Sequence, residues 1–178
     1  MMQVPLRLFL FLFAIISSKM RTNAFSSPNP FKLPPPLLSL VDGFKSMHDE
    51  KIRYKQLLFL ASTCPQMGEE LKVERNKVMG CLSTVHIHAT HSNDGSIKFV
   101  GDSDGQLTKG LCALLTRGLS GATVEEIEAV DPGFIMDCGI GGSLTPSRNN
   151  GFINMLNMMK GKAKEVGEGG AGVVGGVR

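Results

Sequence analysis

A β-hairpin between helical segments constrains the fold of this chain more than any other feature of its sequence. Residues 83–90 (STVHIHAT) alternate between apolar and polar side chains, which is the pattern of a half-buried strand. The Asp94-Gly95 pair predicts a tight turn. Residues 96–102 (SIKFVGD) then predict the returning strand. The pattern indicates an antiparallel hairpin.

Helical patterns stand before and after this hairpin. Apolar residues recur at helical spacing in several segments, and Thr123 with Glu126 has the spacing of a capping box. We expect helices at residues 49–61, 106–119, 123–130 and about 146–164, and a polar loop at residues 68–77. In the last helix we expect four inward side chains, those of Phe152, Ile153, Leu156 and Met159.

These elements predict one α+β domain over residues 45–165, with a small antiparallel β-sheet of about three strands flanked by helices. The sequence shows no internal repeat and no second domain. Residues 166–178 are rich in glycine and predict a flexible tail.

The net charge of +3 comes from the first part of the chain. Residues 1–41 contain four basic and no acidic residues, whereas the rest contains 15 basic and 16 acidic residues. The folded part is therefore near neutral and lacks the basic surface that a nucleic-acid-binding protein needs. Because the chain has no Trp and one Tyr, base stacking on aromatic side chains is also disfavoured.

The N-terminal segment has the pattern of a targeting leader. Residues 1–24 combine an early Arg7 with an apolar run over Leu8–Ile16, which predicts a signal peptide. The run is too short to cross a bilayer, so a membrane anchor is the weaker alternative, and we expect no membrane association of the mature protein. Residues 25–44 are rich in Ser and Pro and are similar to a transit peptide, and we expect no regular helix through Pro34-Pro35-Pro36.

A signal peptide followed by a transit-like segment, with Phe25 at the junction, resembles the bipartite leader of proteins in complex algal plastids. We therefore expect a plastid location, with the mitochondrion as an alternative. Plain secretion is a further alternative. The four cysteines disfavour it, because spacings of 17, 31 and 26 residues form no tight disulfide framework.

Cysteine and histidine are the candidates for chemistry, because P-loop, Cys-x-x-Cys, His-Glu-x-x-His and Gly-x-Ser-x-Gly motifs are absent. Cys112 lies in an apolar helix and is expected in the core. Cys81 follows Gly80 where a charged loop meets the first strand. It is either a reactive thiol at a loop tip or a structural cysteine. A zinc site with His86 and His88 is a further alternative, although it lacks an obvious fourth ligand.

Four short segments, in the right order between residues 54 and 164, resemble the SufE family of sulfur acceptors, and its plastid members most. They are Tyr54–Leu58, Asn76–Ser83 with its Gly-Cys-Leu-Ser sequence, Asp102–Asp104 with the following Leu107–Leu111, and Ser143–Phe152 with its Ser-Arg-Asn-Asn-Gly sequence. Each segment alone is weak, but their order makes the resemblance specific.

The resemblance implies a SufE/IscU-like fold and a reactive cysteine at Cys81. It implies a protein that is not itself an enzyme. Such a protein takes persulfide sulfur from a SufS-like, pyridoxal-phosphate-dependent cysteine desulfurase, activates that enzyme, and passes the sulfur to a SufBCD-type scaffold. We expect no metal and no resident cofactor, only a transient cysteine persulfide. We expect the persulfide loop and partner contacts to involve Gly80, Ser83, Lys77 and Arg148.

Several details remain open at this level. Lys77 and Arg75 either stabilise the Cys81 thiolate or belong to a solvated loop, and the two aspartates at 102 and 104 are expected to cap the helix that follows. Leu82 and His86 depart from the Gln and the aromatic residue common in the family.

The alternative function is a metal-binding iron–sulfur scaffold of the IscU-like fold, which needs three cysteines around one position. A thiol peroxidase would need a resolving cysteine that is not evident.

Overall fold

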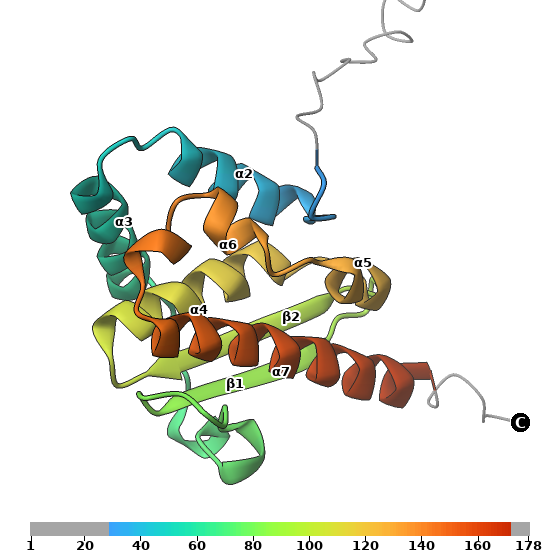
Figure 1. Cartoon of the computed structure of the whole chain (residues 1–178). Helices are drawn as coiled ribbons and strands as arrows, with labels where there is room; N and C mark the ends of the chain where they lie inside the picture. The colour runs from blue at the N-terminus through green and yellow to red at the C-terminus, as the bar shows by residue number, and fades with distance from the viewer. Residues whose placement is uncertain (1–28, 172–178) are drawn as a thin grey trace, which may run out of the picture.

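The hairpin forms a small β-sheet, and two long helices cover one of its faces (Figure 1). The computed structural model describes residues 29–171. Strands β1 (Val85–His91) and β2 (Ile97–Ser103) are antiparallel. Helix α4 (Gln106–Leu119) packs against β2, and α7 (Pro146–Ala171) lies along β1. The chain is therefore an α+β protein, as predicted.

The register of the hairpin places its apolar residues on one face. Val85 pairs with Ser103 and His91 pairs with Ile97, so each strand lies one or two residues later in the chain than predicted. Among the described residues the sheet has two strands, and the predicted count of about three is too high. Two isolated bridges, Lys77–His86 and Ile97–Ala122, add single residues beside the two strands.

The helices begin and end close to the residues that the sequence predicts. Helix α3 spans Glu50–Ser62, and the Asp49 side chain accepts a hydrogen bond from the backbone of Lys51. Helix α4 has the predicted bounds. Helix α5 (Val124–Ala129) begins with both hydrogen bonds of the predicted capping box. The predicted loop at 68–77 contains two short 3-10 turns, η1 (Glu69–Leu71) and η2 (Glu74–Asn76).

The folded domain begins earlier than predicted. Helix α2 (Pro35–Lys45) buries Leu37, Val41 and Phe44 in the core. The prolines do not prevent it, because they occupy the first turn of the helix, where no backbone N–H is needed. We expected no regular helix through Pro34-Pro35-Pro36, but Pro34 is the N-cap of α2 and Pro35 and Pro36 are its first helical residues. Residues 1–28, with the predicted signal peptide and the start of the transit-like segment, lie outside the described residues.

The last helix is longer than predicted. After α6 (Phe134–Asp137) and η3 (Gly141–Ser143), α7 starts at Pro146 as expected and continues to Ala171. The predicted flexible tail is therefore helical from 166 to 171, and residues 172–178 lie outside the described part.

The buried side of α7 also differs in one position from the prediction. Phe152, Leu156 and Met159 are buried as expected, but Met155 is buried in place of Ile153, which is 36% exposed. The spacing of three and four residues among the buried positions defines one helical face, and Ile153 lies outside it. Polar residues interrupt α7 throughout, and none of the helices in the described part is long and apolar enough to span a membrane.

Candidate functional site

Cys81 lies in a short loop that connects the 3-10 turns to β1. We call residues 79–83 the Cys81 loop. A backbone hydrogen bond of 2.8 Å from Val78 to Val85 closes its base. Gly80 has a φ of +76°, a left-handed conformation that glycine adopts without strain. The local sequence therefore permits the sharp turn that presents Cys81, as expected from the Gly-Cys pair.

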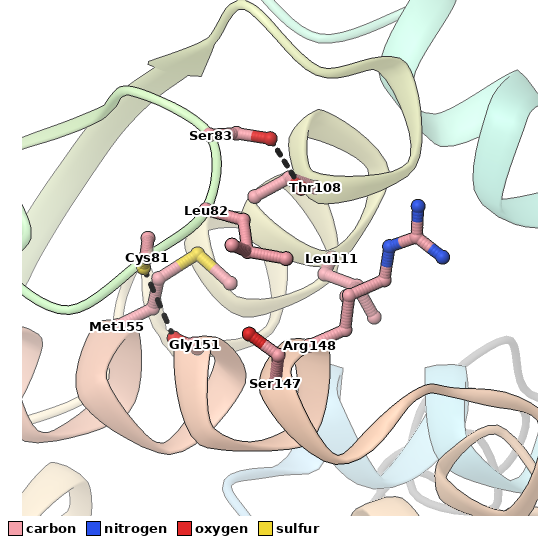
Figure 2. Close-up of a pocket in the computed structure, with 9 residues that line it drawn as sticks. All are labelled: Cys81, Leu82, Ser83, Thr108, Leu111, Ser147, Arg148, Gly151 and Met155. Atoms are coloured by element: carbon pink, nitrogen blue, oxygen red, sulfur yellow. Dashed lines mark hydrogen bonds between the residues drawn. The ribbon is translucent and has the colours of Figure 1, made fainter.

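The loop covers a small pocket between α4 and α7 (Figure 2). The pocket has a volume of about 60 Å³. It is lined by the residues that Figure 2 labels, which are Cys81, Leu82, Ser83, Thr108, Leu111, Ser147, Arg148, Gly151 and Met155. Residues that lie far apart in the sequence thus meet around one thiol.

The Cys81 thiol points toward α7. Its Sγ lies 3.6 Å from the carbonyl oxygen of Gly151, to which it donates a hydrogen bond. A Cβ atom at position 151 would come within 3.3 Å of this sulfur, so the glycine allows the helix to approach. Burial raises the pKa of the Cys81 thiol above its ordinary value. In this conformation burial disfavours the thiolate and partly shields the thiol from solvent.

Side-chain hydrogen bonds hold the loop at both ends. Asn154 Nδ2 donates to the carbonyl oxygen of Met79 over 3.1 Å. At the other end the hydroxyls of Ser83 and Thr108 lie 3.1 Å apart, and the backbone N–H of Thr84 donates to Asp104 over 3.0 Å. The loop is therefore fixed to α7 on one side and to the start of α4 on the other.

Two apolar side chains next to the thiol face solvent. Met79 is 70% exposed and Leu82 is 80% exposed. Cys81 is therefore flanked on both sides by exposed apolar side chains.

The predicted site residues do not all meet at the pocket. Gly80 and Ser83 lie in the Cys81 loop, and Arg148 lines the pocket, with its guanidinium on the opposite side from the thiol (Figure 2). Lys77 is not among the lining residues, and its ammonium lies 3.7 Å from the carboxylate of Glu74. The raised pKa of Cys81 is due to burial, so this conformation gives no support to thiolate stabilisation by Lys77 or Arg75.

The expectation that the two aspartates cap α4 is wrong. Gly105 is the N-cap of α4, and no side chain caps it. Asp102 instead accepts hydrogen bonds from Lys109 at 2.7 Å and Lys72 at 3.0 Å. Burial alone would raise the pKa of Asp102, but these two ammonium groups outweigh it and hold the pKa below the ordinary value. The carboxylate of Asp102 therefore links β2 to Lys109 of α4 and to Lys72.

The other three cysteines have different surroundings. All four are free thiols. Cys112 and Cys138 are buried, and Cys64 is half-buried with its Sγ 3.7 Å from the carbonyl oxygen of Gly101. Burial raises the pKa of all three thiols. Within the described residues, no group of three His, Cys, Asp or Glu side chains could hold a metal ion, so the zinc and scaffold alternatives gain no support there.

Sequence reasoning missed several contributors to this site. Thr108 and Met155 looked like ordinary helical residues, and nothing near Asn154 in the sequence indicates that it bonds to a loop 75 residues away. Gly151 was part of the Ser-Arg-Asn-Asn-Gly segment, but its close approach to Cys81 appears only in three dimensions.

Comparison with known proteins decides the family. The model of the SufE family, described as an Fe-S metabolism associated domain, matches residues 38–163. This chain belongs to the SufE family. The match includes the Cys81 loop, both strands and nearly all of the helices around the pocket, and it begins within α2.

Individual SufE relatives match most of the chain. An uncharacterized SufE-like protein of Synechocystis is 49% identical over 131 residues, which cover 74% of this chain and 82% of that protein. The cysteine desulfuration protein SufE of Plasmodium vivax is 42% identical over 76% of this chain and 55% of its own length. SufE-like protein 1, chloroplastic/mitochondrial, of Arabidopsis thaliana is 40% identical over 79% of this chain and 40% of its own length.

A solved structure supports the fold. The solution structure of a hypothetical protein from Thermus thermophilus aligns with a TM-score of 0.66 at 26% identity, over 75% of this chain and 97% of that one. The SufE-like architecture predicted from the sequence is therefore confirmed.

Proposed function

We propose that this protein is a sulfur acceptor in iron–sulfur metabolism, with Cys81 as the acceptor. In this proposal it takes persulfide sulfur from a pyridoxal-phosphate-dependent cysteine desulfurase of the SufS type, stimulates that enzyme, and passes the sulfur to a SufBCD-type scaffold. The observation that carries the proposal is the position of Cys81. It is a half-buried thiol on a loop whose neighbours Met79 and Leu82 are exposed, above a small pocket.

The transfer step follows from thiol–disulfide chemistry. The Cys81 thiol first loses its proton, and the thiolate attacks the outer sulfur of the desulfurase persulfide. A sulfur–sulfur bond forms on Cys81 while the sulfur–sulfur bond of the desulfurase breaks, and the desulfurase cysteine leaves as a thiolate that takes up a proton. One sulfur atom moves without net oxidation. No metal or resident cofactor of this chain enters the step.

The raised pKa of Cys81 makes activation part of the docking event. In the position seen here the thiol points toward Gly151, and burial disfavours its thiolate. Contact of Met79 and Leu82 with the desulfurase would draw the loop outward, and the lost burial would allow the thiolate to form. The stimulation of the desulfurase then follows from rapid removal of its persulfide.

The pocket suits the product of this step. Its volume of about 60 Å³ is well above the roughly 10–15 Å³ that a cavity needs to hold one water molecule. When the loop returns to the position seen here, one additional sulfur atom fits beneath it. Leu111 and Met155 would shield the persulfide from water and from small thiols.

The names of the relatives support the proposal. The Plasmodium vivax relative is a cysteine desulfuration protein, and a relative in Escherichia coli, 28% identical over 82% of this chain, is the sulfur acceptor protein CsdE. We further propose an organellar location, most consistent with a plastid, because the Arabidopsis relative is chloroplastic/mitochondrial and because residues 1–24 have the pattern of a signal peptide.

The decisive experiment is sulfur loading. The protein is incubated with a SufS-type desulfurase, pyridoxal phosphate and cysteine, and its thiol-containing peptides are then weighed by mass spectrometry. We expect the peptide with Cys81 to gain the mass of one sulfur atom. Cys81→Ser should abolish both the gain and the stimulation of the desulfurase.

Cys64→Ser is the matched control, because Cys64 is also a half-buried thiol whose pKa is raised by burial. It should keep full loading and stimulation. Sulfur found on Cys64 instead of Cys81, or full stimulation by a folded Cys81→Ser variant, would refute the assignment.

A further inference from the structure

A second polar hollow lies where η2, β1 and α7 meet, outside the Cys81 pocket. It has a volume of about 230 Å³ and is open to solvent. Three basic side chains from three different elements line it, namely Arg75 of η2, His88 of β1 and Lys162 of α7. Figure 1 shows α7 running along β1, which brings the C-terminal half of this helix to the strand. The sulfur-transfer proposal does not use these residues.

The position of Lys162 is fixed by a buried partner. Its Nζ donates to Asn76 Oδ1 over 2.7 Å. Asn76 is only 1% exposed, and its own Nδ2 donates to the carbonyl oxygen of Leu71 over 2.7 Å. The ammonium group is therefore held at the edge of the hollow by a neutral amide and not by a carboxylate.

Positive charge in the hollow is incompletely balanced. Within the described residues, no carboxylate lies within 4.0 Å of the charged groups of Arg75 or Lys162. Glu165 is the one acidic side chain that lines the hollow, and it is exposed. With neutral His88 the lining carries two positive charges and one negative charge.

The pKa values of Lys162 and His88 reflect this imbalance of charge. Burial and the nearby Arg75 lower the pKa of Lys162, although Glu165 acts in the opposite direction. Burial, Lys162 and Arg75 all lower the pKa of His88. Each cation therefore makes the next one less favourable. A bound anion would remove this mutual repulsion.

We propose that this hollow is a binding site for a small tetrahedral oxyanion, phosphate or sulfate. The planar guanidinium of Arg75 offers paired donors that match such an anion, and the Lys162 ammonium keeps donors free beside its bond to Asn76. His88 would complete the site as an imidazolium. Three donors on three elements, one of them fixed by a buried amide, give the site a defined shape.

Occupancy would have a structural consequence. An oxyanion shared by Arg75 and Lys162 would join η2 to α7, and η2 leads directly into the Cys81 loop. Binding would therefore restrain the N-terminal side of that loop. The site itself does not depend on the sulfur-acceptor proposal, because it rests on the geometry of the hollow alone.

The test is a titration of the full chain with inorganic phosphate, at constant ionic strength maintained with chloride, followed by NMR of the histidine side chains. We expect a saturable change at His88 and a rise in its pKa, because a bound dianion favours the imidazolium. His86 lies on the same strand but outside the hollow, and it should respond much less. Sulfate in a parallel titration separates oxyanion binding from a specific demand for phosphate.

Two variants and one control locate the site. Arg75→Gln and Lys162→Gln should each weaken binding by about tenfold or more. Lys164→Gln removes the same charge two residues away on the same helix, from a side chain that pairs with Glu128, and it should bind like the wild type. Arg75 is exposed, so its variant is expected to fold even if loss of the Lys162–Asn76 bond disturbs the other.

Each result of this titration either supports the proposed oxyanion site or contradicts it. A saturable His88 response that both site variants lose and the control keeps supports the proposal. An unsaturable response, an equal response in Lys162→Gln and Lys164→Gln, or no change at His88 in the wild type overturns it. Sulfur loading at Cys81 is measured separately, so failure of either proposal leaves the other standing.

Discussion

At the scale of single residues, the ionisation of Cys81 is the property that most affects its reactivity. Burial against α7 raises the pKa of this thiol, so the thiolate forms only at higher pH than for a free cysteine. We expect the rate of alkylation of Cys81 by iodoacetamide to rise with pH through a midpoint above about 8.5, the ordinary value. The measurement is peptide mass spectrometry after timed labelling.

The control for this pH profile is the same labelling in denaturant, where the midpoint should return to the ordinary value because burial is lost. A midpoint in the folded protein below the ordinary value would show that a cation stabilises the thiolate after all. That result would reinstate the role that the sequence suggested for Lys77.

Asn154 is one of the residues that hold the loop in its inward position. Its side chain donates to Met79, and a Cβ atom at Gly80 would lie only 2.7 Å from its Nδ2. Asn154→Ala should free this end of the loop. Since one hydrogen bond of this kind contributes about 0.5–1.5 kcal/mol, we expect alkylation of Cys81 to become faster by a factor of roughly two to thirteen.

The control for this variant is Asn157→Ala, an exposed position one turn later on α7. It should leave the alkylation rate unchanged. If Asn154→Ala alkylates at the wild-type rate and folds normally, the Ser83–Thr108 bond and the Asp104–Thr84 bond hold the loop without it.

At the scale of elements, two glycines in α7 allow two effects of a substitution to be distinguished. One effect is the gain in helix propensity, and the other is contact with the Cys81 thiol. Replacing a helical glycine by alanine usually stabilises a protein by about 0.5–1 kcal/mol. A Cβ atom at Gly161 would have no neighbouring atom within 4 Å, so Gly161→Ala should give the full gain. Gly151→Ala places its methyl 3.3 Å from Cys81 Sγ. It should gain less and should speed alkylation of Cys81 by pushing the thiol outward.

Urea unfolding and timed alkylation of both variants check this prediction. An equal gain in stability for the two variants, with unchanged alkylation, would mean that Gly151 does not determine how α7 and the thiol approach each other.

The elements also show how far local sequence signals extend. The hairpin and the capping box at Thr123 follow from patterns within a few residues, and both were predicted. Helix α2 was not predicted, because a run of prolines suggests a break in a helix. The prolines lie in the first turn of α2, and at that place they are compatible with a helix. The bond from Asn154 to Met79 joins segments 75 residues apart, and no local pattern encodes such a contact. Cys81 itself was found because Gly80 and the family motif mark it locally.

At the scale of the whole molecule, α4 packs against more elements than one face of a helix usually meets. It packs against α2, α3, α7 and β2, and its side chains reach both the Cys81 pocket and the core. A Cβ atom at Gly118 would lie 2.6 Å from Leu37 Cδ1, so α2 sits directly on the backbone of α4. Residues 35–45 are therefore part of the folded domain.

This dependence on α2 leads to a stability prediction. Leu37 is fully buried against α4, and removing a buried leucine side chain leaves a cavity as well as losing its transfer free energy. Leu37→Ala should lower the free energy of unfolding by about 2–5 kcal/mol, measured by urea unfolding followed by circular dichroism. Leu40→Ala, at a half-buried position of the same helix, should cost clearly less. Because no residue of α2 lines the Cys81 pocket, native Leu37→Ala protein should still load sulfur on Cys81. A loss below about 1 kcal/mol, well under the usual range for a buried leucine, would mean that α2 packs only loosely on α4, and the domain would then begin near residue 45 as the sequence suggested.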